Sequence, residues 1–453
     1  MSRWGVGLVI VLLSCVPILL SHATSPDLLR DTDTQVLLDT IRQRQAPLSW
    51  FGGDWPLENH FYRPVSTLFF ELDNALYGSN AAGYGWTNAL LCVASVVLLF
   101  WLWRELADDV PVATLGAIMF ALWHTSFAGK LSMLVFFMSF GAWILAFLPG
   151  RRLWPAIAAF LVLYYLSFEV AGFRALEGRM IAWLPGRTAS VMTVFALLSM
   201  AGYARYERLS ASRVARPEPT PLDPPATKGT VVRAGVARTA WGWLLLSLVG
   251  LVLALGSYEQ AVMLPAALFG VAVSLRLQRY QVRWGLQALF WGLLVGYLAL
   301  RSQIVPTEAS GYQLQQFRSG PGVWQSVMHY IFPAFKDLYS LAMTLDLGPL
   351  QFMSWGPWGS LLFAGSNLAA YGQVLNRRLV LGLTGFALSL VTFLPMAWLK
   401  PFDHYDYWPM AMRSLFVSAL VMAAGGTLVS AASRPAMQAP ARPDPAPGSL
   451  PRR

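Results

Sequence analysis

The segment WTNALLCVASVVLLFWLWREL, from Trp86 to Leu106, contains no charged residue before Arg104. A helix of about 20 predominantly apolar residues crosses the hydrocarbon core of a membrane, so this segment is long enough to span one. Segments of the same kind recur along the 453-residue chain, which is 56% hydrophobic and only 12% charged. The mean hydropathy is +0.50. These values exclude a water-soluble protein and indicate an all-α polytopic membrane protein.

The apolar segments predict about twelve transmembrane helices. We expect these helices near Gly5–Leu20, Trp86–Leu106, Val110–Phe127, Leu131–Leu148, Leu153–Phe168, Thr188–Ala204, Ala240–Ser257, Ala261–Leu275, Trp284–Val305, Trp358–Leu375, Leu379–Leu399 and Met410–Ala431.

Basic residues fall in short clusters on alternate turns between these segments. The clearest are Arg104, Arg151-Arg152, the group from Arg205 to Arg216, Arg377-Arg378 and Arg452-Arg453. Because Lys and Arg are enriched in cytoplasmic loops, this pattern predicts a multi-pass protein of a cell membrane with both termini cytoplasmic. The compact chain without long luminal insertions favours a bacterial inner membrane. The net charge of +10 then reflects topology, and we expect no nucleic-acid partner.

This topology also predicts how the chain is divided. Residues 1–432 form one transmembrane domain, in which residues 22–85 and 306–356 are outer loops facing away from the cytoplasm. Residues 205–239 form a basic cytoplasmic linker, and residues 433–453, rich in proline and alanine, form a disordered cytoplasmic tail.

The first helix has a second interpretation. Arg3, the apolar run after it and Ser21-His22-Ala23 fit a cleavable signal peptide, which would leave the other loops on the same sides. The two cysteines, Cys15 and Cys92, both lie in apolar segments. They exclude a disulfide framework and a cysteine-rich metal site.

The first outer loop holds an acidic pair, Asp31 and Asp33, before a short amphipathic helix that we expect from Thr34 to Arg44. An aspartate here can cap the helix, because its carboxylate accepts hydrogen bonds from free amide groups. It can also serve as a general base toward an acceptor hydroxyl. The pair could further bind a divalent cation, Mg²⁺ or Mn²⁺, through oxygen ligands. All three interpretations remain open.

Farther along the same loop, His60 and Arg63 stand next to aromatic residues. One interpretation is that this region anchors the loop at the membrane interface. The other is that the imidazole and the guanidinium bind the oxygens of a phosphate group.

Six stretches, taken in order, resemble a known family. They read HFYRPVSTL (60–68), LYGSNAAGY (76–84), WTNALL (86–91), LPGR (184–187), SYEQA (257–261) with LP (264–265), and DHYDYWP (403–409). This succession is similar to that of the GT-C superfamily of polytopic glycosyltransferases, in its protein O-mannosyltransferase-like branch. That branch has an acidic pair after the first helix, then Tyr-Arg-Pro, then later elements with a Gly-Arg, a Glu and a Tyr-rich loop.

Three positions depart from the family pattern. Tyr258 stands where the family has a lysine, His404 where it has an arginine, and Cys92 where it usually has a histidine. Two cations expected to face a phosphate are therefore missing or weakened. The departures make a non-catalytic scaffold of the same fold one alternative, and a lipid or solute transporter is another.

The resemblance implies transfer of a sugar from a polyprenyl-phosphate donor to an unknown acceptor hydroxyl at the outer face, with inversion. The partners would then be the lipid bilayer, the donor lipid and that acceptor. Asp33 is the preferred catalytic base, with Asp31 beside it.

The remaining candidates would bind the donor. The resemblance implies that positive groups stabilise the leaving phosphate. It also implies that Glu259 orients a sugar hydroxyl or a cationic partner. We assign these substrate- and phosphate-binding roles to His60, Arg63, Arg187, Glu259 and His404. Each also has a structural interpretation, as an interfacial anchor or as an ionisable residue at a helix end.

Overall fold

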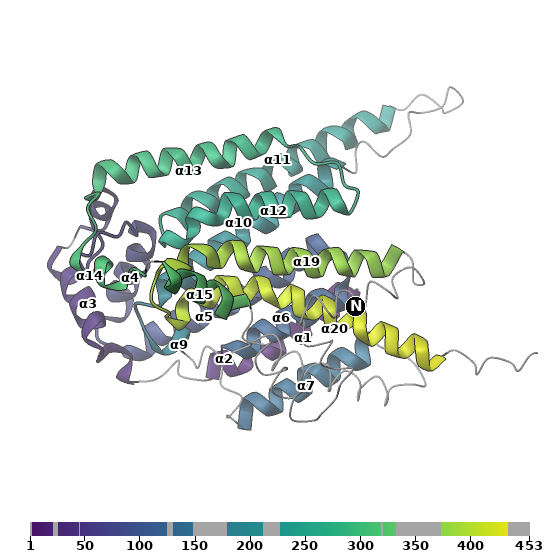
Figure 1. Cartoon of the computed structure of the whole chain (residues 1–453), viewed down its shortest axis with the longest axis horizontal. Helices are drawn as coiled ribbons and strands as arrows, with labels where there is room; N and C mark the ends of the chain where they lie inside the picture. The colour runs from purple at the N-terminus through teal and green to yellow at the C-terminus, as the bar shows by residue number, and fades with distance from the viewer. Residues whose placement is uncertain are drawn as a thin grey trace, which may run out of the picture.

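The computed structural model describes residues 2–20, 26–44, 46–124, 130–147, 179–211, 227–318, 320–331 and 373–433. These residues are helical apart from connecting segments and one isolated antiparallel bridge between Phe317 and Leu399. The long helices lie side by side along one direction, and short helices gather at one end of them (Figure 1). The fold is therefore a helical bundle with an elaborated end.

The elements of the first half are α1 (Arg3–Ser14), α2 (Val16–Leu20), η1 (Pro26–Leu29), α3 (Thr32–Arg44), η2 (Pro47–Gly52), α4 (Pro64–Tyr77), α5 (Ala81–Ala107), α6 (Val110–Trp123), α7 (Lys130–Phe147), α9 (Arg179–Ala182) and α10 (Arg187–Ala211). Those of the second half are α11 (Thr227–Leu255), η3 (Glu259–Met263), α12 (Leu264–Leu277), α13 (Gly285–Ile304), α14 (Gly311–Gln316), α15 (Pro321–Ile331), α19 (Gln373–Phe393), η4 (Leu394–Trp398), η5 (Asp403–Asp406) and α20 (Tyr407–Ser433).

The prediction of an all-helical membrane protein agrees with this architecture. Within the described residues, four helical segments are long and apolar enough to cross a membrane: Arg3–Leu20, Ala81–Ala107, Glu259–Leu277 and Arg377–Trp398. The predicted helices 153–168 and 358–375 lie wholly or mostly outside the described residues, and each of the others has a helical counterpart. A total of twelve spans stays a prediction.

Helix α5 forms the centre of the bundle, as its composition suggests. Asn80 caps its N-terminus by accepting a hydrogen bond from the amide of Ala82 at 3.2 Å. Its inward face, which includes Val96 and Trp103, is fully buried. The Trp103 indole donates to Ser414 Oγ of α20 at 3.1 Å, so the buried polar atom of this tryptophan is satisfied and α5 is fixed against α20.

Helices α10 and α11 pack closely through small residues. A Cβ atom added at Gly250 would lie 2.9 Å from both Phe195 O and Ser199 N of α10. The Ser199 hydroxyl donates to the carbonyl of Ser247 at 2.8 Å. Small residues allow membrane helices to approach closely, and van der Waals contact and interhelical hydrogen bonds then hold them together.

We expect Gly250→Ala to destabilise this pair, because the added methyl group must push two backbones apart. Overpacking of this kind costs about 1–3 kcal/mol. Unfolding of the purified protein in detergent measures the effect. The matched control is Gly242→Ala in the same helix, where an added Cβ meets no atom within 4 Å. Equal stability of the two variants would contradict the close packing.

The basic residues of three predicted cytoplasmic loops meet at one end of the bundle. Buried Glu105 lies 3.4 Å from Arg205 and 3.6 Å from Arg208, while Arg378 lies 3.3 Å from Asp109. The alternation of basic clusters inferred from the sequence thus corresponds to a shared end of α5, α10 and α19. That this end faces the cytoplasm stays a prediction.

The predicted cytoplasmic linker is helical at both of its edges, and the division of the chain at this linker stays a prediction. Helix α10 continues to Ala211 and α11 begins at Thr227, so both helices extend into residues 205–239. The reason is that the flanking sequence of the linker, including Tyr206 to Leu209, remains compatible with helix although it is basic. Residues 212–226 and the tail after Ser433 lie outside the described residues.

Candidate functional site

The predicted outer loops form the end of the bundle opposite the basic residues. Helices α3, α4 and α14 gather there, next to the beginnings or ends of several long helices (Figure 1). The first outer loop supplies α3 and α4, and the second supplies α14 and α15. Residues widely separated in the sequence therefore meet at this end.

Asp31 is the N-cap of α3. Its Oδ2 accepts hydrogen bonds from the amide of Thr34 at 3.2 Å and from the Thr34 hydroxyl at 3.3 Å. The sequence-based boundary was wrong by two residues, because the helix begins at Thr32 and Asp33 lies inside its first turn. The capping interpretation thus applies to Asp31. The Asp33 carboxylate takes no part in capping α3.

Asp33 has an altered acidity. It remains open to solvent on one side, but partial burial raises the pKa of its carboxyl, and the charge of Asp31 raises that pKa further. Both effects disfavour the ionised form. A carboxylate with a raised pKa accepts a proton more readily, which suits a general base.

His404 and Asp31 are joined through a tryptophan from a third segment. The indole of Trp183, between α9 and α10, donates to Asp31 Oδ2 at 3.3 Å. The same indole ring lies 5.1 Å from the His404 ring, centroid to centroid. Tyr405 and Tyr258 complete the surroundings of His404, at 4.5 and 6.3 Å. The structure thus brings Asp31, at the start of α3, close to His404 through Trp183.

Arg63 and Glu259 form an ion pair. Nε and Nη2 of Arg63 donate to Glu259 Oε2 at 2.8 and 2.6 Å. Phe61 and Tyr258 lie against the guanidinium, 4.2 and 4.6 Å from its carbon to their ring centroids. Burial acts to lower the pKa of Arg63, but the charge and hydrogen bond of Glu259, together with the neighbouring Tyr258 and Tyr405, outweigh it, and the pKa is raised. Arg63 therefore stays charged, with part of that charge neutralised by Glu259.

The second carboxylate oxygen of Glu259 is available to a ligand. Oε1 is buried and has no hydrogen-bond partner among the described residues, although the side chain as a whole is 24% exposed. A buried, unsatisfied acceptor is costly. A sugar hydroxyl that donated to this oxygen would remove the cost, which agrees with the role expected of Glu259.

His60 contacts one backbone carbonyl of the second outer loop and the side chains of Arg301, in α13, and Gln313, in α14. Its Nδ1 lies 2.9 Å from the carbonyl oxygen of Glu308, and its own carbonyl accepts from Arg301 and Gln313 at 3.2 Å. His60 also has a positive φ of 62°. These contacts join the two outer loops, and its binding of phosphate stays a prediction.

Arg187 is fully buried, so it does not extend to the membrane interface. Its Nη1 lies 2.6 Å from Asp73 Oδ2, its Nε donates to Asn88 Oδ1 at 2.6 Å, and its Nη2 donates to the carbonyl of Tyr84 at 2.9 Å. These bonds connect α10 with α4 and α5. Arg187 therefore holds the neighbouring segments together, and its direct contact with phosphate stays a prediction.

A divalent cation at Asp31 and Asp33 would find no third His, Cys, Asp or Glu ligand in the part of the chain that the structure describes. Among the described residues, no group of three or more His, Cys, Asp or Glu side chains is arranged to hold a metal ion. Asp31 Oδ2 is already used in capping α3. The metal site stays a prediction.

Three residues of this region, Trp183, Tyr312 and Asp73, were not among those predicted from the sequence. Trp183 stands directly before the quoted LPGR stretch, and this adjacency was the signal for it. Tyr312 of α14 is coupled electrostatically to both Asp33 and Arg63, but nothing in its sequence surroundings distinguishes it. Asp73 was signalled only as one of the two acids in α4.

Helix α4 ties the site to the rest of the bundle. The amide of Val65 donates to the carbonyl of Gly256 at 2.9 Å, and the Ser66 hydroxyl donates to the carbonyl of Ser257 at 2.9 Å. These bonds fix Arg63, which precedes α4, next to Glu259, which follows Gly256 and Ser257.

Comparison of the chain with protein-family models, with characterised proteins and with solved structures found no match.

Proposed function

We propose that this protein is a membrane glycosyltransferase of the GT-C type. It would transfer a sugar from a polyprenyl-phosphate donor to an acceptor hydroxyl at the outer end of the bundle. One observation carries the proposal: Trp183 connects His404 with Asp31, which stands two residues before Asp33 in the first outer loop, although these residues come from distant parts of the chain. Acids and a histidine gathered at one end of a membrane protein fit a reactive site.

The reaction needs one base and a stabilised leaving group. Asp33 takes the proton of the acceptor hydroxyl while that oxygen attacks the anomeric carbon. The bond from the anomeric carbon to the phosphate oxygen breaks, and the polyprenyl phosphate leaves with the electron pair. Attack from the opposite side inverts the anomeric centre. His404 and Arg63 are the proposed groups that stabilise the phosphate.

Glu259 and Arg187 have supporting roles in this proposal. Glu259 Oε1 accepts a hydrogen bond from a donor sugar hydroxyl, while Oε2 holds Arg63 in place. Arg187 is a positioning residue, because its partners Asp73 and Asn88 connect α10 to α4 and α5. The apolar helices would bind the prenyl chain, which explains why the transferase is embedded in a membrane.

Sugar transfer by the purified protein in lipid tests the proposal. A panel of radiolabelled polyprenyl-phosphate sugars serves as donors, and both released sugar and a labelled acceptor are measured. Turnover with any donor supports the proposal. The absence of turnover with every donor, in protein that remains folded, would favour the non-catalytic scaffold or the transporter.

The pH dependence of transfer gives a second prediction. The charge of Asp31 contributes to the raised pKa of Asp33, so Asp31→Asn should lower that pKa. Because the base must be ionised, the acidic limb of kcat/KM should move to lower pH in Asp31→Asn. Asparagine caps a helix about as well as aspartate, so α3 should keep its stability.

Asp39→Asn is the control for this pH experiment. Asp39 lies on the same helix, is exposed and pairs with Arg42 at 3.2 Å. Its replacement should leave the pH profile unchanged. An acidic limb that stays in place in Asp31→Asn would mean that Asp33 is not the group titrating there.

A further inference from the structure

The turn between α12 and α13 carries three arginines and no acid. It reads RLQRYQVRW from Arg276 to Trp284, and neither α12 nor α13 contains an Asp or a Glu. Helix α13 lies along one edge of the bundle and runs from this turn toward α14 at the other end (Figure 1). The turn is therefore a local concentration of positive charge, apart from the candidate site.

This charge lies where a helix long enough to span a membrane ends. The segment Glu259–Leu277 is apolar enough to cross the bilayer, so Arg276 in its last turn lies near the level of the lipid head groups. Trp284, at the other end of the turn, is 44% exposed, and tryptophan is enriched at the interface between membrane and water. The arginines are thus placed beside lipid head groups.

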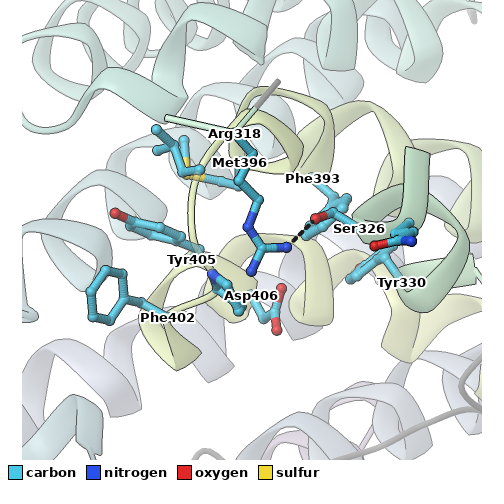
Figure 2. Close-up of a pocket in the computed structure, with 11 residues that line it drawn as sticks. Arg318, Ser326, Tyr330, Phe393, Met396, Phe402, Tyr405 and Asp406 are labelled. Atoms are coloured by element: carbon cyan, nitrogen blue, oxygen red, sulfur yellow. Dashed lines mark hydrogen bonds between the residues drawn. The ribbon is translucent and has the colours of Figure 1, made fainter. Parts of the chain in front are cut away.

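Arg276 and Arg279 have no protein partner in the described part of the chain. Both are exposed, and neither guanidinium makes a hydrogen bond, an ion pair or a ring contact there. Arg318, between α14 and α15, differs, because it lines a pocket of about 400 Å³ in which its Nη1 donates to Ser326 Oγ at 2.8 Å (Figure 2). The guanidinium groups of Arg276 and Arg279 are therefore available to donate to a ligand.

The backbone at Arg279 adds a second observation. Its φ is 69°, and the amide of Tyr280 donates to the carbonyl of Leu275 at 3.0 Å. This pattern ends a helix with a left-handed residue that is usually glycine, so an arginine there is strained. A cation near a helix C-terminus is favourable, but Arg276 already supplies one in the last turn of α12. A partner outside the protein accounts for a second arginine at this strained position.

The turn is attached to the bundle on both sides. The amide of Arg283 lies 3.3 Å from both carboxylate oxygens of Glu207 in α10, and Nη1 of Arg283 donates to the Tyr206 hydroxyl at 2.6 Å. Nε of Arg377 in α19 donates to Gln278 Oε1 at 3.2 Å. Because these bonds fix the backbone of the turn, little ordering is required when a ligand binds.

The described acids at this end leave the surface of the turn positive. Asp108 lies 3.7 Å from Arg377, and Asp109 lies 3.3 Å from Arg378, so both pair with α19. Glu207 is fully buried. A ligand that approaches the turn from the membrane therefore meets guanidinium groups rather than carboxylates.

An apolar surface continues from the arginines along the two helices. Phe269 lies seven residues before Arg276, which places it two turns away on the same face of α12. Phe269 is 45% exposed and Leu277 is 61% exposed, and the centroid of the Phe269 ring lies 5.7 Å from that of Trp284. A ligand with a negative head and an apolar tail would contact both parts of this surface.

We propose that the α12–α13 turn binds a membrane phospholipid of net negative charge. Its phosphate accepts hydrogen bonds from Arg276 and Arg279, because a guanidinium matches the geometry of phosphate oxygens. Its acyl chains lie against Phe269, Leu277 and Trp284. Basic pockets at the ends of membrane helices bind anionic head groups in this way. This binding does not depend on the proposed sugar transfer, which is assigned to the opposite end of the bundle.

Lipid binding to the full-length protein in an uncharged detergent tests the proposal. Native mass spectrometry measures the dissociation constant of the tightest-bound molecule for three probes. These are dioleoyl phosphatidylglycerol, dioleoyl phosphatidylcholine, and glycerophosphoglycerol, which is the first head group without acyl chains. Wild type should bind phosphatidylglycerol about tenfold or more tightly than the other two. The double variant Arg276→Gln/Arg279→Gly should lose this preference.

Arg279→Gly alone separates binding from folding. Glycine adopts a φ of 69° without strain, so this variant should unfold at the same temperature as wild type or higher in lipid-free detergent, yet bind phosphatidylglycerol more weakly. Damage to the fold cannot produce both results. Arg3→Gln is the matched control, because Arg3 is exposed and its neighbour Trp4 contacts Arg104 at the same end of the bundle. It should keep the wild-type affinity.

Each of three outcomes would overturn the proposal. The first is a wild type that binds phosphatidylglycerol and phosphatidylcholine equally. The second is a loss of affinity that is as large in Arg3→Gln as in the double variant, or absent from both, since binding would then not depend on the turn. The third is glycerophosphoglycerol that binds as tightly as the intact lipid, because the apolar surface would then take no part.

Discussion

Replacing Asp33 by asparagine should reduce sugar transfer by about 10²–10⁴-fold, the usual contribution of general acid–base catalysis. Asparagine has nearly the same shape as aspartate but cannot take a proton from the acceptor hydroxyl. Asp33 lies in the first turn of α3 and makes no contact that caps the helix, a task performed by Asp31. The measurement is kcat/KM with a polyprenyl-phosphate sugar, at matched amounts of folded protein.

Two variants separate loss of the base from damage to α3. Asp39→Asn removes an exposed carboxylate of the same helix and should retain full activity. Asp33→Glu keeps a carboxylate that reaches farther by one methylene, so it should retain part of the activity. Full turnover by Asp33→Asn would move the base to Asp31 or to another group, even if the transferase itself were established.

The helical framework was predictable because it depends on local sequence. Apolar runs such as Trp86 to Trp103 predicted helices directly, and α5 covers that run. The prediction that an aspartate caps α3 is confirmed, although the helix begins earlier than expected. Aspartate is favoured both at the cap and in the first turn, so the sequence alone could not choose between Asp31 and Asp33.

The candidate site was less predictable because its contacts join distant segments. The pairing of Arg63 with Glu259 and the position of Trp183 between Asp31 and His404 depend on how α4, α10 and η5 pack. Hydrophobic periodicity indicates which face of a helix is buried but not which helix it meets. A family resemblance identified most of these residues as candidates for one site. Which of them contact one another depends on how the helices pack.

Arg187 is another residue whose partner could not be predicted from the sequence. Its guanidinium suggested a phosphate ligand, but in the structure it pairs with Asp73. A guanidinium near an outer loop suits a phosphate. In the structure, however, the side chains of Arg187 and Asp73 are only 0% and 3% exposed, and their nearest nitrogen and oxygen lie 2.6 Å apart. No local sequence pattern indicated that a residue of α10 would pair with one of α4.

Arg187→Met should cause a large loss of stability, about 3–5 kcal/mol, because it leaves the Asp73 carboxylate buried without its partner. Asn88 Oδ1 and the Tyr84 carbonyl would also lose their donor. We expect little folded protein after extraction in detergent. Arg42→Met, which breaks the exposed pair with Asp39, is the control and should cost about 0–1 kcal/mol.

A double variant distinguishes the loss of a charge partner from the loss of bulk. Replacing a buried ion pair by apolar residues of similar volume is often neutral or stabilising, so Arg187→Met with Asp73→Leu should recover most of the stability that Arg187→Met loses. Sugar transfer by that folded double variant then tests the role of Arg187. Retained transfer would mean that Arg187 only positions α10 and Trp183 relative to α4, whereas folded protein without transfer would return Arg187 to the phosphate-binding role expected from the sequence.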